Sequence, residues 1–160
     1  MPEATPTPAK VRTCLWYDGK ALEAARFYVS LLPDSRIDGV FRPQADGPEL
    51  VVNFVLADTP YQGLNGGPQH PFTEAASISV STRDQAETDR LWEALLADGG
   101  TPKACGWLAD RYGLCWQIIP EALPRLLADP DPAAAGRVME AMMGMIKIDI
   151  AGLEAAHRGG

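Results

Sequence analysis

Few side chains in this sequence have the types needed for metal chemistry. The 160 residues include two histidines, His70 and His157, and three cysteines, Cys14, Cys105 and Cys115. His70 lies in a segment rich in Gly and Pro, and His157 lies three residues before the last residue of the sequence. Because loops and terminal segments are usually solvated, we expect both imidazoles on the surface and neither in a metal site.

The cysteines favour a reducing environment. Their number, three, is odd, and all lie in apolar runs that resemble strands. We therefore expect reduced thiols in a cytoplasmic protein. Cys115 is a candidate nucleophile, but no His or carboxylate is evidently placed beside it to lower its pKa. A buried, inert thiol is the favoured interpretation.

Charge and hydropathy exclude two classes of partner. The chain has 14 Lys and Arg against 21 Asp and Glu, a net charge of −7, and its basic residues are scattered. Nucleic-acid binding needs clustered positive charge, so we expect no nucleic-acid partner. No apolar run approaches the ~20 residues that span a bilayer, so we expect no membrane partner.

Hydrophobic periodicity predicts one order of elements twice, within a single α+β domain. Residues 1–10 read as a flexible lead-in without the features of a signal peptide. The first βαβββ module covers 11–67 and the second covers 75–120. A helical tail follows at 121–158. Within the modules we expect helices at 21–32 and 83–98; the remaining predicted elements are strands at 11–17, 36–41, 50–57, 59–67, 75–82, 101–107, 108–112 and 114–119, and tail helices at 121–128, 132–146 and 150–157.

The two modules also match residue by residue. A shift of 64 positions aligns five identical pairs in the two helices: Glu23 with Glu87, Arg26 with Arg90, Leu31 with Leu95, Leu32 with Leu96 and Asp34 with Asp98. The same shift places Thr13 opposite Ser77. A duplicated βαβββ unit is the economical interpretation, and each copy alone would leave one sheet face uncovered.

Six segments resemble the PhnB-like branch of the vicinal oxygen chelate superfamily, which includes glyoxalase I, bleomycin-resistance proteins and extradiol dioxygenases. The likeness covers roughly residues 10–157. It is carried by residues 14–19 (CLWYDG), 23–28 (EAARFY), 64–68 (LNGGP), 74–77 (EAAS), 89–92 (DRLW) and 105–120 (CGWLADRYGLCWQIIP). The resemblance implies paired βαβββ modules forming a cupped, half-open barrel-like sheet around a cavity, and a homodimer.

Metal-dependent members of that superfamily place His and Glu ligands on the first, fourth, fifth and eighth strands. Carried over to this sequence, the first-strand and fifth-strand positions fall at Thr13 and Ser77. The eighth-strand position falls at Gln117, and the fourth-strand position at Gln62 or Leu64. Neutral hydroxyls and amides bind divalent transition metals weakly, so we expect no metal and no cofactor.

Strand alternation extends these positions into a candidate pocket for a small organic ligand. Side chains two residues apart on a strand share a face, and Trp107 could add a stacking wall. The pocket that results is apolar with a few hydroxyl, thiol and amide groups. An alternative is that these side chains fill the cup as ordinary core. The candidate residues are Thr13, Leu15, Tyr17, Gln62, Ser77, Ser79, Trp107, Cys115 and Gln117.

The leading hypothesis is therefore a small-molecule-binding protein without the superfamily metal site, with the question of catalysis left open. The alternative is a metal-dependent lyase, isomerase or dioxygenase that uses non-standard ligands. The branch is often labelled 3-demethylubiquinone-9 3-methyltransferase, but a methyl-donor site in a doubly wound fold needs a Gly-rich turn between a strand and a helix. The Gly-rich stretch here, residues 63–67, precedes a Pro and a linker instead.

Overall fold

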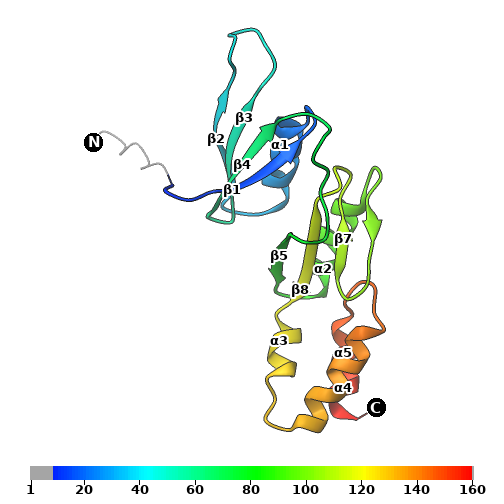
Figure 1. Cartoon of the computed structure of the whole chain (residues 1–160). Helices are drawn as coiled ribbons and strands as arrows, with labels where there is room; N and C mark the ends of the chain where they lie inside the picture. The colour runs from blue at the N-terminus through cyan, green and yellow to red at the C-terminus, as the bar shows by residue number, and fades with distance from the viewer. Residues whose placement is uncertain (1–8, 160) are drawn as a thin grey trace, which may run out of the picture. The chain divides into compact units, whose positions relative to one another are not determined.

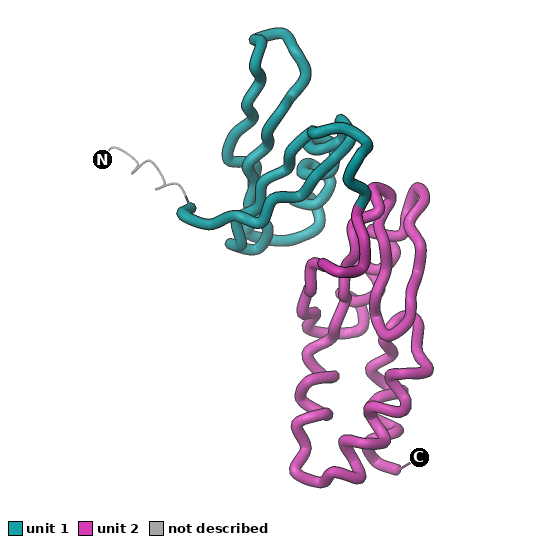
Figure 2. Tube along the Cα trace, viewed as in Figure 1, with its two compact units in different colours: residues 1–71 teal, residues 72–160 magenta. Residues whose placement is uncertain are grey.

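The computed structural model describes residues 9–159. The chain divides into two compact units, residues 1–71 and 72–160, shown in teal and magenta in Figure 2. The division falls inside the segment between the two predicted modules. The predicted lead-in at 1–10 lies outside the described residues, except for its last two positions.

The first unit is a four-stranded sheet covered by one helix (Figure 1). The strand order is β1-β4-β3-β2, with β1 parallel to β4 and the other pairs antiparallel. Its elements are β1 (Thr13–Tyr17), α1 (Ala21–Leu31), β2 (Arg36–Phe41), β3 (Val51–Leu56) and β4 (Thr59–Asn65).

The second unit repeats this topology in the strand order β5-β8-β7-β6. Its elements are β5 (Ser77–Thr82), α2 (Gln85–Leu96), β6 (Thr101–Pro102), β7 (Trp107–Ala109) and β8 (Cys115–Pro120). The predicted duplicated βαβββ architecture is thus confirmed. The predicted strand at 101–107 is mostly wrong, because the chain turns after Pro102 through Cys105 and Gly106, both with positive φ.

Three helices follow β8, as predicted: α3 (Ala122–Leu127), α4 (Pro132–Met143) and α5 (Ile150–Arg158). They gather at one end of the second sheet, coloured yellow to red in Figure 1. Helix α4 ends three residues earlier than expected, at Met143. None of the helices within residues 9–159 is long and apolar enough to cross a membrane.

In each unit the helix covers one face of the sheet and buries the apolar side chains there. In the first unit, close approach of α1 needs Gly63 on β4, where a Cβ would lie 3.0 Å from the Cβ of Ala21. The buried side chains around it include Leu15, Tyr17, Val52 and Phe54 from the strands and Ala24, Ala25 and Tyr28 from α1. The corresponding core of the second unit includes Ile78, Leu108, Trp116 and Ile118 with Leu91, Trp92 and Leu95 of α2.

Helix α2 begins with a reciprocal cap of the kind that S/T/D-x-x-E patterns favour. Asp84 Oδ1 accepts a hydrogen bond of 2.8 Å from the Glu87 backbone N–H. Glu87 Oε2 in turn accepts one of 2.8 Å from the Arg83 backbone N–H. The Arg83 N–H is the main reason that the pKa of Glu87 lies below its usual range.

The carboxamide of Gln85 joins the tail to α2. Its Nε2 donates to Asp89 Oδ1 at 2.9 Å and to the Ile148 carbonyl at 3.1 Å. Its Oε1 accepts from the Ile150 N–H, the first residue of α5, at 2.9 Å. Lys147 adds an ion pair with Asp89 at 2.7 Å. One side chain therefore fixes both the end of the α4–α5 connection and the start of α5.

Asp110, only 3% exposed, organises the hairpin between β7 and β8. Its Oδ1 accepts from the backbone N–H groups of Tyr112 and Leu114, at 2.8 and 3.0 Å. Its Oδ2 accepts from the indole Nε1–H of buried Trp116 at 2.9 Å. The sequence pattern Asp-x-x-Gly indicates a turn, but the structure shows that this carboxylate also satisfies a donor in the core.

Replacing Asp110 with Ala leaves three donors, two of them in buried hydrogen bonds, without this acceptor, and we expect a loss of about 3 kcal/mol or more in unfolding free energy. Urea denaturation followed by far-UV circular dichroism measures it. Asp46→Ala, in the exposed loop between β2 and β3, is the matched control and should change stability by less than about 0.5 kcal/mol. Equal effects of the two substitutions would contradict the role given to Asp110.

Glu87→Gln removes the charge from the α2 cap and should cost about 1 kcal/mol at pH 7. A depressed carboxyl pKa contributes stability that is complete above the unfolded value of about 4.3 and is lost as pH falls through the folded value. The difference between wild type and variant should therefore shrink below about pH 4.3. Thermal unfolding between pH 3 and pH 7 checks this, and a difference independent of pH would refute it.

Candidate functional site

Each sheet has a second face, opposite its helix, and the strand register defines which side chains lie there. In the first unit Leu15 and Tyr17 point toward α1, so the alternation places Cys14 and Trp16 on the open face. Cys14 pairs in register with Gln62 of β4, which pairs with Asn53 of β3. The Gln62 amide donates to Asn53 Oδ1 at 3.0 Å, across that face.

The predicted orientation of the first strand is therefore wrong. Thr13, Leu15 and Tyr17 were expected to face the cavity but lie on the α1 side of the sheet. Leu15 and Tyr17 are 7% and 3% exposed, and the hydroxyl of Tyr17 lies 3.4 Å from that of Tyr28 on α1. They belong to the core of the first unit.

The error has a simple geometric cause. The helices of the two units align with a shift of 64, because α1 begins at Ala21 and α2 at Gln85. The strands before them end at Tyr17 and Thr82, which are 65 positions apart, because the turn in the first unit is one residue longer. A slip of one residue along a strand exchanges its two faces. The structural counterpart of Ser79 is therefore Cys14.

In the second unit the structure brings predicted site residues together on the open face. Ser79, Gln117 and Trp107 are consecutive cross-strand partners on β5, β8 and β7. The Gln117 amide donates to the hydroxyl of Ser77 at 2.8 Å. That bond fixes the orientation of the carboxamide at the centre of the face.

Cys115 lies two residues before Gln117 on β8, so its side chain is on the same face of the sheet, but it is only 2% exposed. Burial raises the pKa of its thiol, and the opposing effect of the Lys103 charge is smaller. Cys14 of the first unit also has a pKa raised by burial. A raised pKa keeps a thiol protonated at neutral pH, so neither cysteine is an activated nucleophile.

A cavity of about 400 Å³ lies on the open face of the second sheet, where the tail helices meet it. Its walls contain no Asp, Glu, Lys, Arg or His. The sequence predicted three of its lining residues, Ser79, Trp107 and Gln117, but missed Leu123 and Leu127 of α3 and Met142 of α4. Local sequence patterns place those residues on helices, but they do not say which sheet the helices cover.

The two open faces carry equivalent amides. Gln62 pairs with Cys14, Gln117 pairs with Ser79, and Cys14 and Ser79 are themselves counterparts. Of the two candidates for the fourth-strand position, Gln62 is therefore the one at the register of Gln117. The structure gives each Gln a hydrogen-bonded neighbour in its own unit.

These positions do not fit the divalent metal that the superfamily resemblance implies. Cys14, Gln62, Ser79 and Gln117 supply one thiol, one hydroxyl and two amides, and Ser77, the residue aligned by sequence, adds only a hydroxyl. Within residues 9–159 no group of three or more His, Cys, Asp or Glu is arranged to hold a metal.

The two histidines lie in different places. The His70 ring packs edge-on against Trp16 of the first sheet, with the ring centroids 4.8 Å apart. His157 of α5 pairs with Asp129, with Nε2 2.8 Å from Oδ2. Neither belongs to a group of three or more potential metal ligands within residues 9–159.

A second cavity, of about 490 Å³, lies in the first unit between the loop that joins β2 to β3 and the turn before α1. Asn65 lines it, but both ends of the Asn65 amide already hold the backbone. Its Oδ1 accepts from the Ala21 N–H at 2.9 Å and its Nδ2 donates to the Glu49 carbonyl at 3.0 Å. This cavity is larger, but the amide of Asn65 is already used to hold the backbone and is not free to bind a ligand. We therefore place the candidate site on the second sheet.

Comparison with known proteins is consistent with this geometry. Residues 9–119 match the family model described as 3-demethylubiquinone-9 3-methyltransferase. The match ends at the last strand, so the three tail helices lie outside it. No curated protein matches the chain.

Solved structures share the fold. The PhnB protein from Bacillus cereus is 29% identical with a TM-score of 0.63, over 70% of this chain and 99% of its own. The protein PA1353 from Pseudomonas aeruginosa is 22% identical with a TM-score of 0.58, over 71% of this chain and 98% of its own. The fosfomycin resistance protein FosX from Mesorhizobium loti is 15% identical with a TM-score of 0.56, over 78% of this chain and 100% of its own.

The family match covers both βαβββ units, and the strand topology agrees with it. The chain belongs to the family described as 3-demethylubiquinone-9 3-methyltransferase, the PhnB-like branch of the vicinal oxygen chelate superfamily.

Proposed function

We propose that this protein binds a small, uncharged organic molecule with a flat ring on the open face of its second sheet, without a divalent metal. The observation that carries the proposal is the 400 Å³ cavity, whose walls combine apolar side chains with an indole, a hydroxyl, an amide and the Cys105 thiol but no Asp, Glu, Lys, Arg or His. Small-molecule sites are typically apolar, with a few polar groups that set orientation.

The polar groups are suited to hydrogen bonding with a neutral ligand. A carboxamide has two N–H donors and a carbonyl acceptor. One N–H of Gln117 is bound to Ser77, which orients the amide and leaves its other N–H and its oxygen for a ligand. The neighbouring Trp107 offers an indole surface for stacking. Because no opposite charge is at hand to compensate it, a charged ligand would lose its hydration without gain.

Binding is better supported than catalysis. A nucleophilic site needs a base that activates the nucleophile. The hydroxyl of Ser79 has no His or carboxylate beside it in the cavity wall, and burial raises the pKa of Cys115. The shape of the cavity and its hydrogen-bonding groups therefore favour ligand binding over nucleophilic catalysis.

The methyltransferase description of the family is not the function that this geometry supports. A methyl-donor site of the doubly wound type uses a parallel sheet with helices on both faces and a Gly-rich turn after the first strand. Here each sheet has one parallel strand pair and order β1-β4-β3-β2 or its equivalent. The turn between β1 and α1 contains a single glycine, Gly19.

Two further expectations belong to the same proposal. The three cysteines are unpaired in the structure, which supports a reducing, cytoplasmic environment. A homodimer is proposed from the superfamily resemblance, and sedimentation at micromolar concentration would test it.

Ligand binding can be tested with naphthalene-2-carboxamide, a flat and neutral probe, against its charged analogue 2-naphthoate. We expect the amide to perturb NMR signals of the second sheet and the carboxylate to bind at least about tenfold more weakly. Gln117→Ala should weaken binding of the amide about tenfold, the effect of one hydrogen bond of about 1.4 kcal/mol.

Gln62→Ala, the equivalent change in the first unit, is the matched control and should leave the affinity unchanged. Equal binding of the neutral and charged probes, or equal effects of the two Gln substitutions, would contradict the proposed site.

Metal content separates this proposal from its rival, a metal-dependent lyase, isomerase or dioxygenase. Because neutral amide and hydroxyl groups bind Zn, Ni, Mn and Fe weakly, we expect these ions to leave the thermal midpoint of the purified protein unchanged. Elemental analysis should find them well below one per chain. One tightly held divalent ion per chain would favour the rival function.

A further inference from the structure

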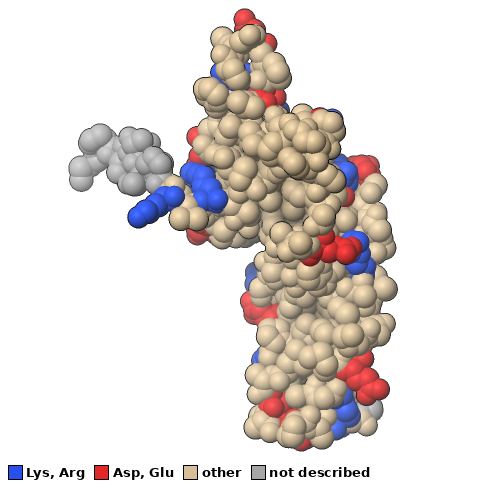
Figure 3. All heavy atoms as spheres, viewed as in Figure 1, with Lys and Arg blue, Asp and Glu red and all other residues tan. Residues whose placement is uncertain are grey.

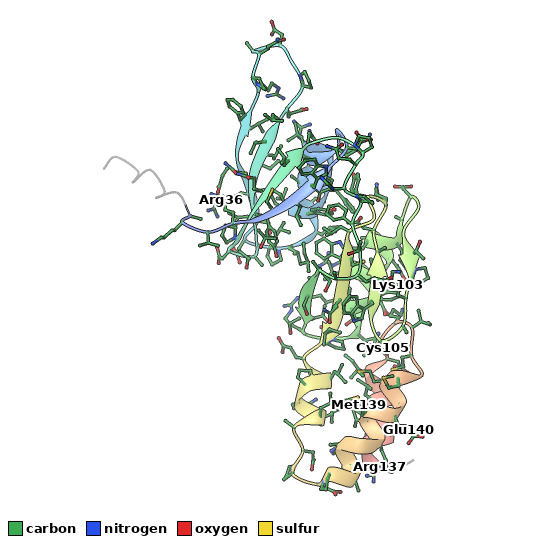
Figure 4. All side chains as sticks on the ribbon, viewed as in Figure 1. Arg36, Lys103, Cys105, Arg137, Met139 and Glu140 are labelled. Carbon is green, nitrogen blue, oxygen red and sulfur yellow. The ribbon has the colours of Figure 1, made fainter. Side chains whose placement is uncertain are left out.

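Sulfur atoms gather where the second sheet meets the tail. Four of the five methionines, Met139, Met142, Met143 and Met145, fall within seven residues at the end of α4. Cys105, in the turn between β6 and β7, faces them, and its Sγ lies 4.0 Å from the Sδ of Met143. Figure 4 labels Cys105 and Met139 on the two sides of this junction.

The backbone holds the two sides of this cluster together. The Cys105 N–H donates to the Met145 carbonyl at 2.8 Å, and the Gly106 N–H donates to the Ile146 carbonyl at 2.8 Å. The thiol is therefore placed against the end of α4 by the main chain, independently of any contact between the sulfur atoms. Such prior placement lowers the entropic cost of binding an ion between them.

The sulfur separation suits a shared metal ion. Two sulfur atoms 4.0 Å apart, each bonded to a metal at the usual metal–sulfur length of about 2.3 Å, subtend an angle of about 120°. That is the angle of trigonal coordination. Met142, the residue before Met143, lines the same cavity as Cys105 and is the candidate for a third sulfur ligand.

The surroundings select a soft, singly charged ion. Thiolate and thioether ligands favour Cu(I), whereas Mg²⁺, Ca²⁺ and Mn²⁺ favour oxygen ligands. The cavity wall that contains Cys105 has no carboxylate or imidazole that would add ligands for a harder ion. A Cu(I) ion bound to one thiolate has no net charge, so this apolar setting imposes little desolvation penalty on it.

We propose that Cys105, Met143 and Met142 form a trigonal site for Cu(I). On binding, the Cys105 thiol releases its proton to water, a Cu–S bond forms and copper remains Cu(I), so no oxidant or reductant is consumed. Met143, 64% exposed, leaves the site open to solvent on one side, which gives copper a path to enter and leave. The site is distinct from the strand positions of the superfamily metal, although Cys105 and Met142 also line the 400 Å³ cavity.

The test titrates the full chain with Cu(I) under anaerobic, reducing conditions against the chromophoric chelator bicinchoninate. Wild type should withdraw one Cu(I) per chain, and X-ray absorption should show sulfur neighbours at about 2.3 Å. Cys105→Ser should abolish this capture, and Met143→Leu should weaken it on the order of tenfold or more. Met143→Leu keeps an apolar side chain at an exposed position, so it should fold even if Cys105→Ser does not.

Matched controls are Cys14→Ser, another thiol outside the junction, and Met139→Leu, another methionine of α4 that is 44% exposed. Both should bind copper as wild type does. The proposal is overturned if no stoichiometric copper is withdrawn from the chelator, if Met143→Leu binds as tightly as wild type, or if either control loses the ion to the same extent.

Discussion

A four-stranded sheet with one covering helix can bury only one of its two faces, and this constraint shapes both units. Alternation along the strands sends Leu15 and Tyr17 under α1, and Ile78 and Trp116 under α2. The alternate side chains of each strand lie on the opposite, open face of the sheet, which the module helix does not cover. In the second unit the tail helices α3 and α4 cover part of that face and turn it into a cavity. The charged groups visible in Figure 3 are scattered over the surface of this unit.

The order of elements was predictable because helix and strand periods differ and because the duplicated pattern is strong. The strand faces were predictable in the second unit, where Ser79 and Gln117 lie as expected. The predicted faces were wrong in the first unit. The shift of 64 aligns the helices but not the strands before them, because the turn between β1 and α1 is one residue longer. Helix identities therefore do not determine the strand register, and Cys14 was missed for this reason.

The packing of the tail helices was the other feature that the sequence did not predict. Its helices could be recognised from the sequence, but the sheet that they cover depends on contacts distant in sequence. Gln85 bonding to Ile148 and Ile150, and Cys105 bonding to Met145, are such contacts. Each joins residues about 40 or more positions apart, beyond the range of any local pattern. The same contacts set the wall of the cavity and the sulfur cluster.

The Gln85 carboxamide has a dynamic consequence. Gln85 is the first residue of α2, and its planar amide bonds to both Ile148 and Ile150 at the start of α5. Separation of α5 from α2 therefore breaks both of these hydrogen bonds of Gln85 in one step. Cooperative opening of this kind defines a single unit of local unfolding. The tail and the second sheet should then exchange their amide hydrogens as one body, although the family match stops before the tail begins. The tail, which lies outside the family match, thus contributes to the stability of the second unit.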